Sequence, residues 1–169
     1  WNSVAHRWAA FLTAWTILRR TRPLPSARMN AFNVAYGDLR IVVVEDDDTL
    51  RDDVLVPRMR QYGFALVPMR TAAQLQASLL EAPPDIVVLD VGLPDADGFA
   101  LARSLRESWP TMGVVMLTGR GETADRIRGL TEGADAYLSK PVDLGLFAAA
   151  LHSVARRVQP ERFAPRAPA

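Results

Sequence analysis

Residues 41–48 read Ile-Val-Val-Val-Glu-Asp-Asp-Asp, four apolar residues followed directly by four acids. A strand buried on both faces of a parallel sheet reads as such a continuous β-branched run, and open α/β sheets place their sites at the carboxyl ends of these strands. Residues 86–90, Ile-Val-Val-Leu-Asp, repeat the pattern with an acid at the same place. The two stretches predict parallel strands that deliver carboxylates to one edge of a sheet.

The acids at these strand ends indicate a cation site. Consecutive carboxylates repel one another unless a cation lies among them, and Mg²⁺ takes oxygen ligands while keeping some of its waters. Glu45, Asp46 and Asp90 are therefore candidate ligands of a hard cation. The alternative interpretation is that Asp47 or Asp48 caps the next helix, because aspartates that precede a helix often do so.

Composition limits the fold and the function. The chain has 169 residues, 49% of them hydrophobic, which is enough for one good core, and the absence of cysteine excludes disulfides, thiolate zinc sites and cysteine catalysis. No apolar run reaches the length of a membrane span.

The charged residues argue about partners. Residues 38–158 hold 13 basic and 18 acidic side chains, so this part of the chain does not resemble a nucleic-acid-binding surface. Lys140 is the single lysine among 20 basic residues, which indicates that an ammonium group is needed there.

Residues 1–37 form a basic segment with five arginines and no acid. Residues 21–37 read as a linker. The stretch before them predicts an amphipathic helix, because its apolar residues recur at steps of three and four. These residues are Trp1, Val4, Trp8, Phe11, Trp15 and Leu18. Three interpretations stay open. In order of preference they are an extension upstream of a start at Met29 or a weakly ordered tail, an association helix, and a membrane-surface helix.

From residue 39 the chain alternates strand and helix. Apolar runs predict strands over about 40–44, 64–67, 85–89, 113–117 and 136–139, and helices over about 48–61, 71–80, 98–108, 122–132 and 143–158. Pro57 should kink or shorten the first helix, Thr71 is a candidate N-cap, and Gly133 suits a helix end. Five such repeats predict an α/β fold with a doubly wound, five-stranded parallel sheet and helices on both faces.

The strand ends together supply groups suited to phosphoryl transfer onto an aspartate, namely a cation site, a carboxylate nucleophile, a hydroxyl and an ammonium. Asp95 and Asp97 are interpreted as turn residues and Gly98 as the flexible point of that turn. In a doubly wound sheet the groups that converge on one edge would be Glu45, Asp46, Asp90, Thr118 and Lys140.

Four motifs occur in a fixed order: Val44-Glu45-Asp46-Asp47, Leu89-Asp90 with Leu93-Pro94 and Asp97-Gly98, Leu117-Thr118-Gly119, and Gly-Ala-Asp-Ala-Tyr-Leu-Ser-Lys-Pro over residues 133–141. Each motif is weak alone, but the ordered set is highly specific. It resembles the receiver domain of two-component response regulators, over residues 38–158. The resemblance implies the flavodoxin-like (βα)5 receiver fold, a cytoplasmic location, and a sensor histidine kinase or phosphotransfer protein as partner.

The resemblance also implies roles for individual residues. Asp90 would be the phosphoacceptor. Glu45, Asp46, Asp90 and the backbone carbonyl of Gly92 would hold Mg²⁺. Lys140, joined to Pro141 by a cis peptide bond, would contact the phosphoryl group.

The same family uses a switch that reaches an output face. Thr118 would be the switch hydroxyl and Tyr137 the switch aromatic, and the face built from residues 122–158 would change on phosphorylation. In the transcription-factor branch this face dimerises through charge pairs, but the usual acid and arginine are Ala136 and Ala150 here. Self-association through this face is therefore either lost or apolar.

Three other classes of function are weighed against the phosphoacceptor. A DNA-binding transcriptional regulator would carry its output domain beyond residue 169, with residues 159–169 as a disordered linker, while this chain alone would bind no nucleic acid. A phosphatase of the haloacid dehalogenase type needs an acid two residues after its nucleophile. Gly92 stands at that position, so we expect that the chain is not an enzyme. A degenerate receiver that only binds partners is disfavoured by the complete acid set.

Overall fold

The predicted strands are all present in the computed structural model, which describes residues 36, 38–119, 127–128 and 131–163. One parallel sheet has the order β2-β1-β3-β4-β5 and is formed by β1 (Ile41–Val44), β2 (Leu66–Met69), β3 (Ile86–Asp90), β4 (Gly113–Thr118) and β5 (Ala136–Ser139). The strand order reverses direction next to β1, which defines a doubly wound sheet. The predicted fold class is confirmed.

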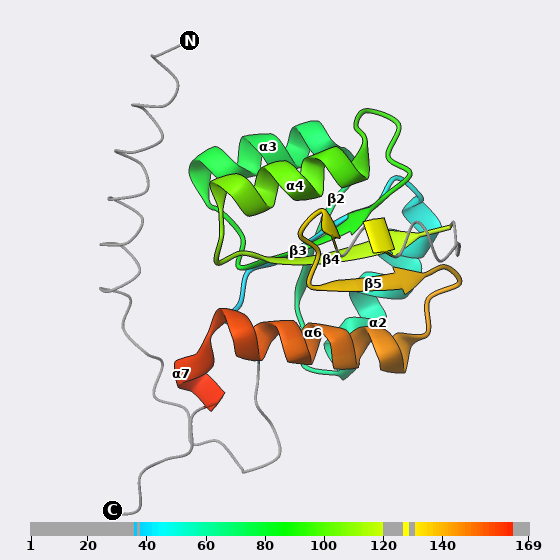
Figure 1. Ribbon diagram of the computed structural model, residues 1–169. Coiled ribbons are helices and arrows are strands. Elements are labelled where there is room, and N and C mark those ends of the chain that lie inside the picture. Colours follow the sequence, from blue (N-terminus) through cyan, green and yellow to red (C-terminus); the bar gives the residue numbers. More distant parts are fainter. Residues whose placement is uncertain (1–35, 37, 120–126, 129–130, 164–169) are drawn as a thin grey trace, which may run out of the picture. The chain divides into compact units, whose positions relative to one another are not determined.

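Helices cover both faces of the sheet. In Figure 1, α3 (Ala72–Glu81) and α4 (Gly98–Ser108) lie on one face, and α2 (Val56–Gln61) and α6 (Leu144–Val158) lie on the other. A π-helix, η1 (Thr49–Leu55), leads into α2, and a short α7 (Pro160–Phe163) follows α6. Over the residues that the structure describes, no helix has the length and apolar character needed to cross a membrane.

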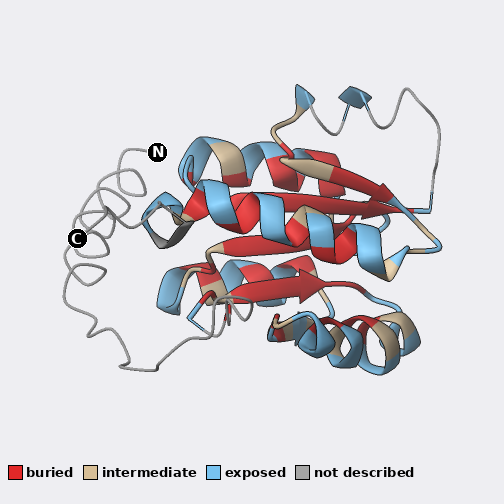
Figure 2. Cartoon of the chain, turned by 90° about the horizontal axis from the view of Figure 1, so that it is seen from below, coloured by how far each residue is buried: buried red, intermediate tan, exposed pale blue. Residues whose placement is uncertain are grey.

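The core lies between the sheet and its helices. Every residue of β1, β3 and β4 is buried, and α3, α4 and α6 are each buried along the stripe that faces the sheet (Figure 2). Leu117 and Leu138 belong to one buried cluster with Phe147 and Leu151 of α6. Because side chains alternate along a strand, Thr118 and Tyr137 lie on the opposite face, toward α3 and α4.

The first predicted helix is interrupted at Pro57, as its sequence predicts. The π-helix η1 ends at Leu55, and Pro57 is the second residue of α2. Proline has no N–H to donate to the carbonyl four residues earlier. The π-helix before it ends in a wider turn, in which the N–H of Val56 donates to the carbonyl of Arg51, and α2 begins at Val56.

The second strand lies two residues later than predicted, at Leu66–Met69 instead of 64–67. It contains Pro68, which interrupts neither pairing nor register because β2 is the edge strand of the sheet. Phe64 is therefore outside the strand, and its buried ring packs in the core.

Tyr36 corrects the prediction that residues 1–37 are only extension and linker. It is 4% exposed, its ring stacks on Phe64 with centroids 4.2 Å apart, and its hydroxyl is hydrogen-bonded to Nδ1 of His152 on α6. The packed domain thus includes at least this residue of the predicted linker. Residues 1–35 and 37, with the predicted amphipathic helix, lie outside the described residues.

Other predicted boundaries have mixed outcomes. Thr71 is the N-cap of α3 and forms a capping box with Gln74. Gly133 has a φ of 102°, a conformation that favours glycine, but the predicted helix 122–132 before it lies mostly outside the described residues. The linker predicted from residue 159 is wrong at Pro160–Phe163, which form α7, and residues 164–169 are not described.

Replacing Tyr36 with alanine should lower the free energy of unfolding by about 3 kcal/mol, because a buried, stacked ring is lost. Tyr36→Phe, which keeps the stack but loses the hydrogen bond to His152, should cost about 1 kcal/mol. Urea unfolding of both variants would measure this. Tyr62→Ala is the matched control because Tyr62 is 46% exposed, and an equal loss in that variant would contradict the role given to Tyr36.

Candidate functional site

Strand register brings the predicted site residues to one edge of the sheet. Val44 pairs with Leu89, so Glu45 and Asp90 follow as neighbours. Thr118 pairs with Ser139, and the N–H of Lys140 donates to the Thr118 carbonyl at 2.7 Å. The convergence predicted from the sequence is therefore present.

Lys140 connects the two buried acids of the site. Its Nζ lies 2.7 Å from Oε2 of Glu45 and 3.2 Å from Oδ1 of Asp90. Glu45 and Asp90 are 0% and 4% exposed, so both carboxylates depend on partners in place of water. The need for an ammonium at position 140 is explained by this double contact. The peptide bond from Lys140 to Pro141 is cis, as the resemblance implied.

The two charges of this contact shift each other's protonation. Burial raises the pKa of the Glu45 carboxyl; Lys140 lowers it and the Asp90 charge raises it, so that the net direction is upward. Burial lowers the pKa of Lys140, but the hydrogen bond with Glu45 and the attraction of Asp90 outweigh it and raise the pKa above its ordinary value. Lys140 therefore stays charged at neutral pH.

The donor set at this edge fits a hard cation. One carboxylate oxygen from each of Glu45, Asp46 and Asp90 lies within 4.8 Å of the others, and Asp46 is exposed to solvent. These are oxygen donors only, on two adjacent strand ends, which is the donor type that Mg²⁺ prefers. The residues predicted from the sequence are thus close enough to share one ion.

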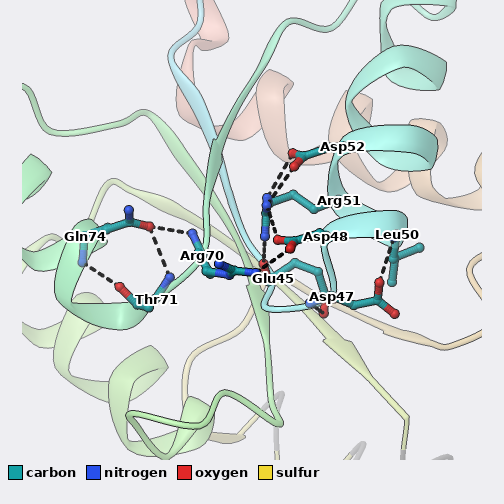
Figure 3. A network of polar contacts seen from close by, with 9 residues as sticks. All are labelled: Glu45, Asp47, Asp48, Leu50, Arg51, Asp52, Arg70, Thr71 and Gln74. Atoms are coloured by element: carbon teal, nitrogen blue, oxygen red, sulfur yellow. Dashed lines mark hydrogen bonds and ion pairs between the residues drawn. The ribbon is translucent and has the colours of Figure 1, made fainter.

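The remaining acids of the run 45–48 have other partners (Figure 3). Oδ1 of Asp47 accepts a hydrogen bond from the N–H of Leu50 at 3.0 Å, so the capping interpretation is confirmed for Asp47. Asp48 stands at the N-cap position of η1 but makes no side-chain capping hydrogen bond. Its carboxylate forms ion pairs with Arg51, at 2.6 Å, and with Arg70.

A pocket of about 470 Å³ opens beside Asp90. Thr118 is 1% exposed at its wall, and Tyr137 is 8% exposed on the same face of the sheet, with a hydroxyl that finds no hydrogen-bond partner among the described residues. The pocket is lined by Asp90, Val91, Gly92, Asp97, Phe99, Thr118, Gly119, Arg128 and Lys140.

The loop after Asp90 is held by two caps that the sequence did not predict. Asp97 is the N-cap of α4 and accepts from the N–H of Phe99 at 2.9 Å. Asp95 accepts from the N–H groups of Ala72 and Ala73, at 3.1 and 3.0 Å, and so caps α3, which lies more than twenty residues earlier in the chain. Both residues lie in the predicted turn, but each is a capping residue as well.

Gly98 is needed for space, not for flexibility. A Cβ at this position would lie 2.7 Å from the Cα of Val91 and 2.9 Å from the carbonyl oxygen of Asp90. Its φ is not positive, since the described glycines with positive φ are Gly63 and Gly133. The start of α4 therefore packs directly on the backbone of the Asp90 loop, and the prediction of a flexible point is corrected.

Two arginines near the site were missed in the sequence. Arg51 is 7% exposed and contacts the backbone of Glu45. Arg128 lines the pocket with its guanidinium 4.3 Å from the centre of the Phe99 ring. The closeness of Arg51 to the acid run was a usable signal, because residues three and four apart on a helix are neighbours. No sequence pattern near Arg128 indicated that this residue would line the pocket.

One predicted surface stays a prediction. The self-association face over residues 122–158 includes a segment that is largely outside the described residues. Where it is described, Ile127 and Leu146 are 62% and 58% exposed, while Ala136 and Ala150 are partly buried.

Comparison with known proteins gives a consistent result. The model of the response regulator receiver domain matches residues 41–152. The transcriptional regulatory protein CreB of Escherichia coli (strain K12) is 38% identical over 117 residues, and the KDP operon transcriptional regulatory protein KdpE of the same organism is 39% identical over 120 residues. Each alignment covers 69% of this chain and 51% of the relative, so the chain spans about half the length of these curated relatives.

A solved structure of similar fold is the response regulator DrrB of Thermotoga maritima, an OmpR/PhoB homologue. It aligns with a TM-score of 0.62 and 28% identity, over 73% of this chain and 54% of DrrB.

Asp95→Ala should lower the thermal stability at neutral pH and lose this effect in acid. The N–H groups of Ala72 and Ala73 hold the pKa of Asp95 below its ordinary value. A group whose pKa is depressed by folding stabilises the folded state above its unfolded pKa, about 3.9, and loses this contribution as the pH falls through the folded value. Thermal melts from pH 7 to pH 3 should show the wild type and variant converging. Asp53→Ala, at an exposed acid, is the control, and a pH-independent gap for Asp95→Ala would contradict the assignment.

Proposed function

Because the chain belongs to the response regulator receiver domain family, we propose that it accepts a phosphoryl group on Asp90 and signals this event through a change of conformation. The observation that carries the proposal is the buried Asp90 carboxylate, 3.2 Å from Nζ of Lys140 and grouped with oxygens of Glu45 and Asp46. A sensor histidine kinase or a phosphotransfer protein would be the donor.

In the transfer, a carboxylate oxygen of Asp90 forms a bond to phosphorus as the bond to the leaving nitrogen of a phosphohistidine breaks, and the electron pair stays on that imidazole. The Lys140 ammonium binds one phosphoryl oxygen and the Thr118 hydroxyl binds another. Glu45, Asp46, Asp90 and the Gly92 carbonyl would hold Mg²⁺. When bound, this ion neutralises charge on the carboxylates and the phosphoryl oxygens together.

The chain acts in this proposal as a signalling module and not as a catalyst with turnover. A phosphatase that uses an aspartate nucleophile needs a second acid placed to activate water, and the residue two positions after Asp90 is Gly92. The phosphorylated state therefore lasts long enough to be recognised by a partner.

The switch follows from the added charge. A phosphoryl group on Asp90 brings acceptor oxygens into the pocket that Thr118 lines. Attraction of the Thr118 hydroxyl to these oxygens changes the packing on the face where Tyr137 is buried. The surface over residues 122–158 is the output face in this proposal.

Control of transcription is the second function we propose, for a longer protein of which this chain would be a part. CreB and KdpE are named transcriptional regulatory proteins, and this chain matches about half of each. The DNA-binding function would belong to a domain other than this one, because residues 38–158 carry more acids than bases. DNA-binding assays on this chain, and on any longer gene product that contains it, would test the proposal.

The first test is intact mass spectrometry after incubation with Mg²⁺ and acetyl phosphate. The wild type should gain the mass of one phosphoryl group, and Asp90→Asn should gain none, because an amide oxygen is a poor nucleophile. Removal of Mg²⁺ with a chelator should also abolish the gain. Asp47→Asn is the matched control from the same acid run, since asparagine caps as well as aspartate. An equal gain in Asp90→Asn would place the phosphoryl group on another residue.

The second test concerns the switch. Thr118→Ala should still be phosphorylated, but the phosphorylation-dependent change in backbone hydrogen exchange over residues 131–158 should disappear, because the hydroxyl that follows the phosphoryl group is absent. Thr118→Ser keeps the hydroxyl and should keep the change. A full response in Thr118→Ala would remove this residue from the switch.

A further inference from the structure

We infer that Arg51 is a positioning residue that holds the carboxylates at the end of β1 in place and thereby sets the affinity of the site for Mg²⁺. The inference deepens the proposed function and rests on its assignment of Glu45 and Asp46 to the metal. It concerns a residue that contacts neither Asp90 nor the pocket beside it in the described structure.

The Arg51 guanidinium is fixed by its partners on three sides (Figure 3). Nη1 donates to the carbonyl oxygen of Glu45 at 2.6 Å. Nη2 donates to Asp48 at 2.6 Å and to Asp52 at 2.7 Å, and Nε donates to Asp52 at 3.0 Å. A planar guanidinium held by two carboxylates cannot turn without breaking charge-assisted bonds. The two acids therefore aim the third N–H group at the Glu45 carbonyl.

The contact with the Glu45 carbonyl controls where Asp46 lies. A peptide unit is planar, so a fixed carbonyl oxygen fixes the orientation of the unit that links Glu45 to Asp46. The Asp46 side chain is exposed and has no hydrogen bond or ion pair of its own among the described residues. Its carboxylate stays within 4.8 Å of those of Glu45 and Asp90 because the backbone holds it there.

Arg51 also decides which acids are available to a cation. Asp48 and Asp52 lie close to the site in sequence, but the Arg51 guanidinium binds both oxygens of Asp52 and one oxygen of Asp48, and Arg70 binds the other oxygen of Asp48. Arg51 thus binds none of the side-chain oxygens of Glu45, Asp46 and Asp90; Glu45 and Asp90 contact Lys140 instead. Loss of Arg51 would release the Asp52 carboxylate and one oxygen of Asp48, whose other oxygen stays paired with Arg70. It would also leave the peptide between Glu45 and Asp46 without its anchor.

Arg70 provides a matched control in the same network. It forms an ion pair with Asp48, as Arg51 does, but its side chain is 58% exposed and makes no hydrogen bond with the Glu45 carbonyl. Replacing either arginine with lysine keeps the charge. The two variants therefore differ in whether the backbone of the metal-binding turn loses its anchor.

Isothermal titration calorimetry with Mg²⁺ alone is the decisive experiment. Arg51→Lys should bind Mg²⁺ about tenfold more weakly than the wild type, as is usual when a residue that orients metal ligands is changed. Arg70→Lys should stay within about twofold of the wild type. At saturating Mg²⁺, acetyl phosphate should phosphorylate Arg51→Lys to the wild-type extent, since the reacting groups are intact.

Arg51→Met separates positioning from charge. Removal of a cation next to the site would by itself tighten Mg²⁺ binding, whereas loss of the anchor weakens it. Weaker binding in Arg51→Met supports the inference and tighter binding overturns it. If either Arg51 variant does not fold, Asp52→Glu keeps all charges and only displaces the oxygens that orient the guanidinium. It should show a smaller loss in the same direction.

The outcomes also separate this inference from the proposed function. Lower unfolding stability with unchanged Mg²⁺ affinity would reduce Arg51 to a structural role and overturn the inference. If the wild type binds Mg²⁺ but is not phosphorylated, the proposed function fails while the role of Arg51 is still decided by titration. If the wild type binds no Mg²⁺, both fail.

Discussion

Repulsion among the carboxylates of Glu45, Asp46 and Asp90 is the constraint on which this structure depends. Strand register places these oxygens within 4.8 Å of one another, and two of the three residues are buried. At such separations like charges cost far more in a protein interior than in water. Lys140 offsets the cost for Glu45 and Asp90 through a compact ammonium. A branched, planar guanidinium would fix the acids as strongly, but it would be harder to displace from between them in the proposed phosphoryl transfer.

Arginines are used where a carboxylate or a carbonyl is to stay fixed. Arg51 holds Asp48, Asp52 and the Glu45 carbonyl beside the site. At the opposite edge of the sheet, Arg106 and Arg157 hold Asp135 at 2.8 and 2.7 Å, next to the start of β5. The single lysine is thus found at the one place where the proposed chemistry requires a cation to exchange partners. The different uses of arginine and lysine follow from the planar shape of the guanidinium and the compact shape of the ammonium group.

The sheet and its site were predictable because they follow from short-range patterns. Buried β-branched runs indicated the strands, and because parallel strands end at the same edge of the sheet, Glu45, Asp90 and Lys140 were expected to meet there. The effect of Pro57 on its helix and the cap at Thr71 were also predictable, because each depends only on neighbouring residues in the chain. Contacts between distant parts of the chain were not predictable, such as Tyr36 with His152 or Asp95 with the start of α3. For β2, an edge strand tolerated Pro68, and the prediction had ended the strand before it.

The alternation of side chains also separates the chemistry from the response. Glu45, Asp90 and Lys140 continue rows of residues that face α2 and α6, whereas Thr118 and Tyr137 lie on the other face. Under the proposed switch, Thr118 is the link, because it lines the pocket and lies two residues from the partner of Tyr137 in β4. The buried Tyr137 hydroxyl has no partner among the described residues, and such a group costs free energy that exposure to water would recover. Its buried position is therefore opposed by a penalty comparable to the gain of one hydrogen bond. The free-energy difference between the buried and exposed positions of Tyr137 is therefore small enough for a single new hydrogen bond at Thr118 to change which position is favoured.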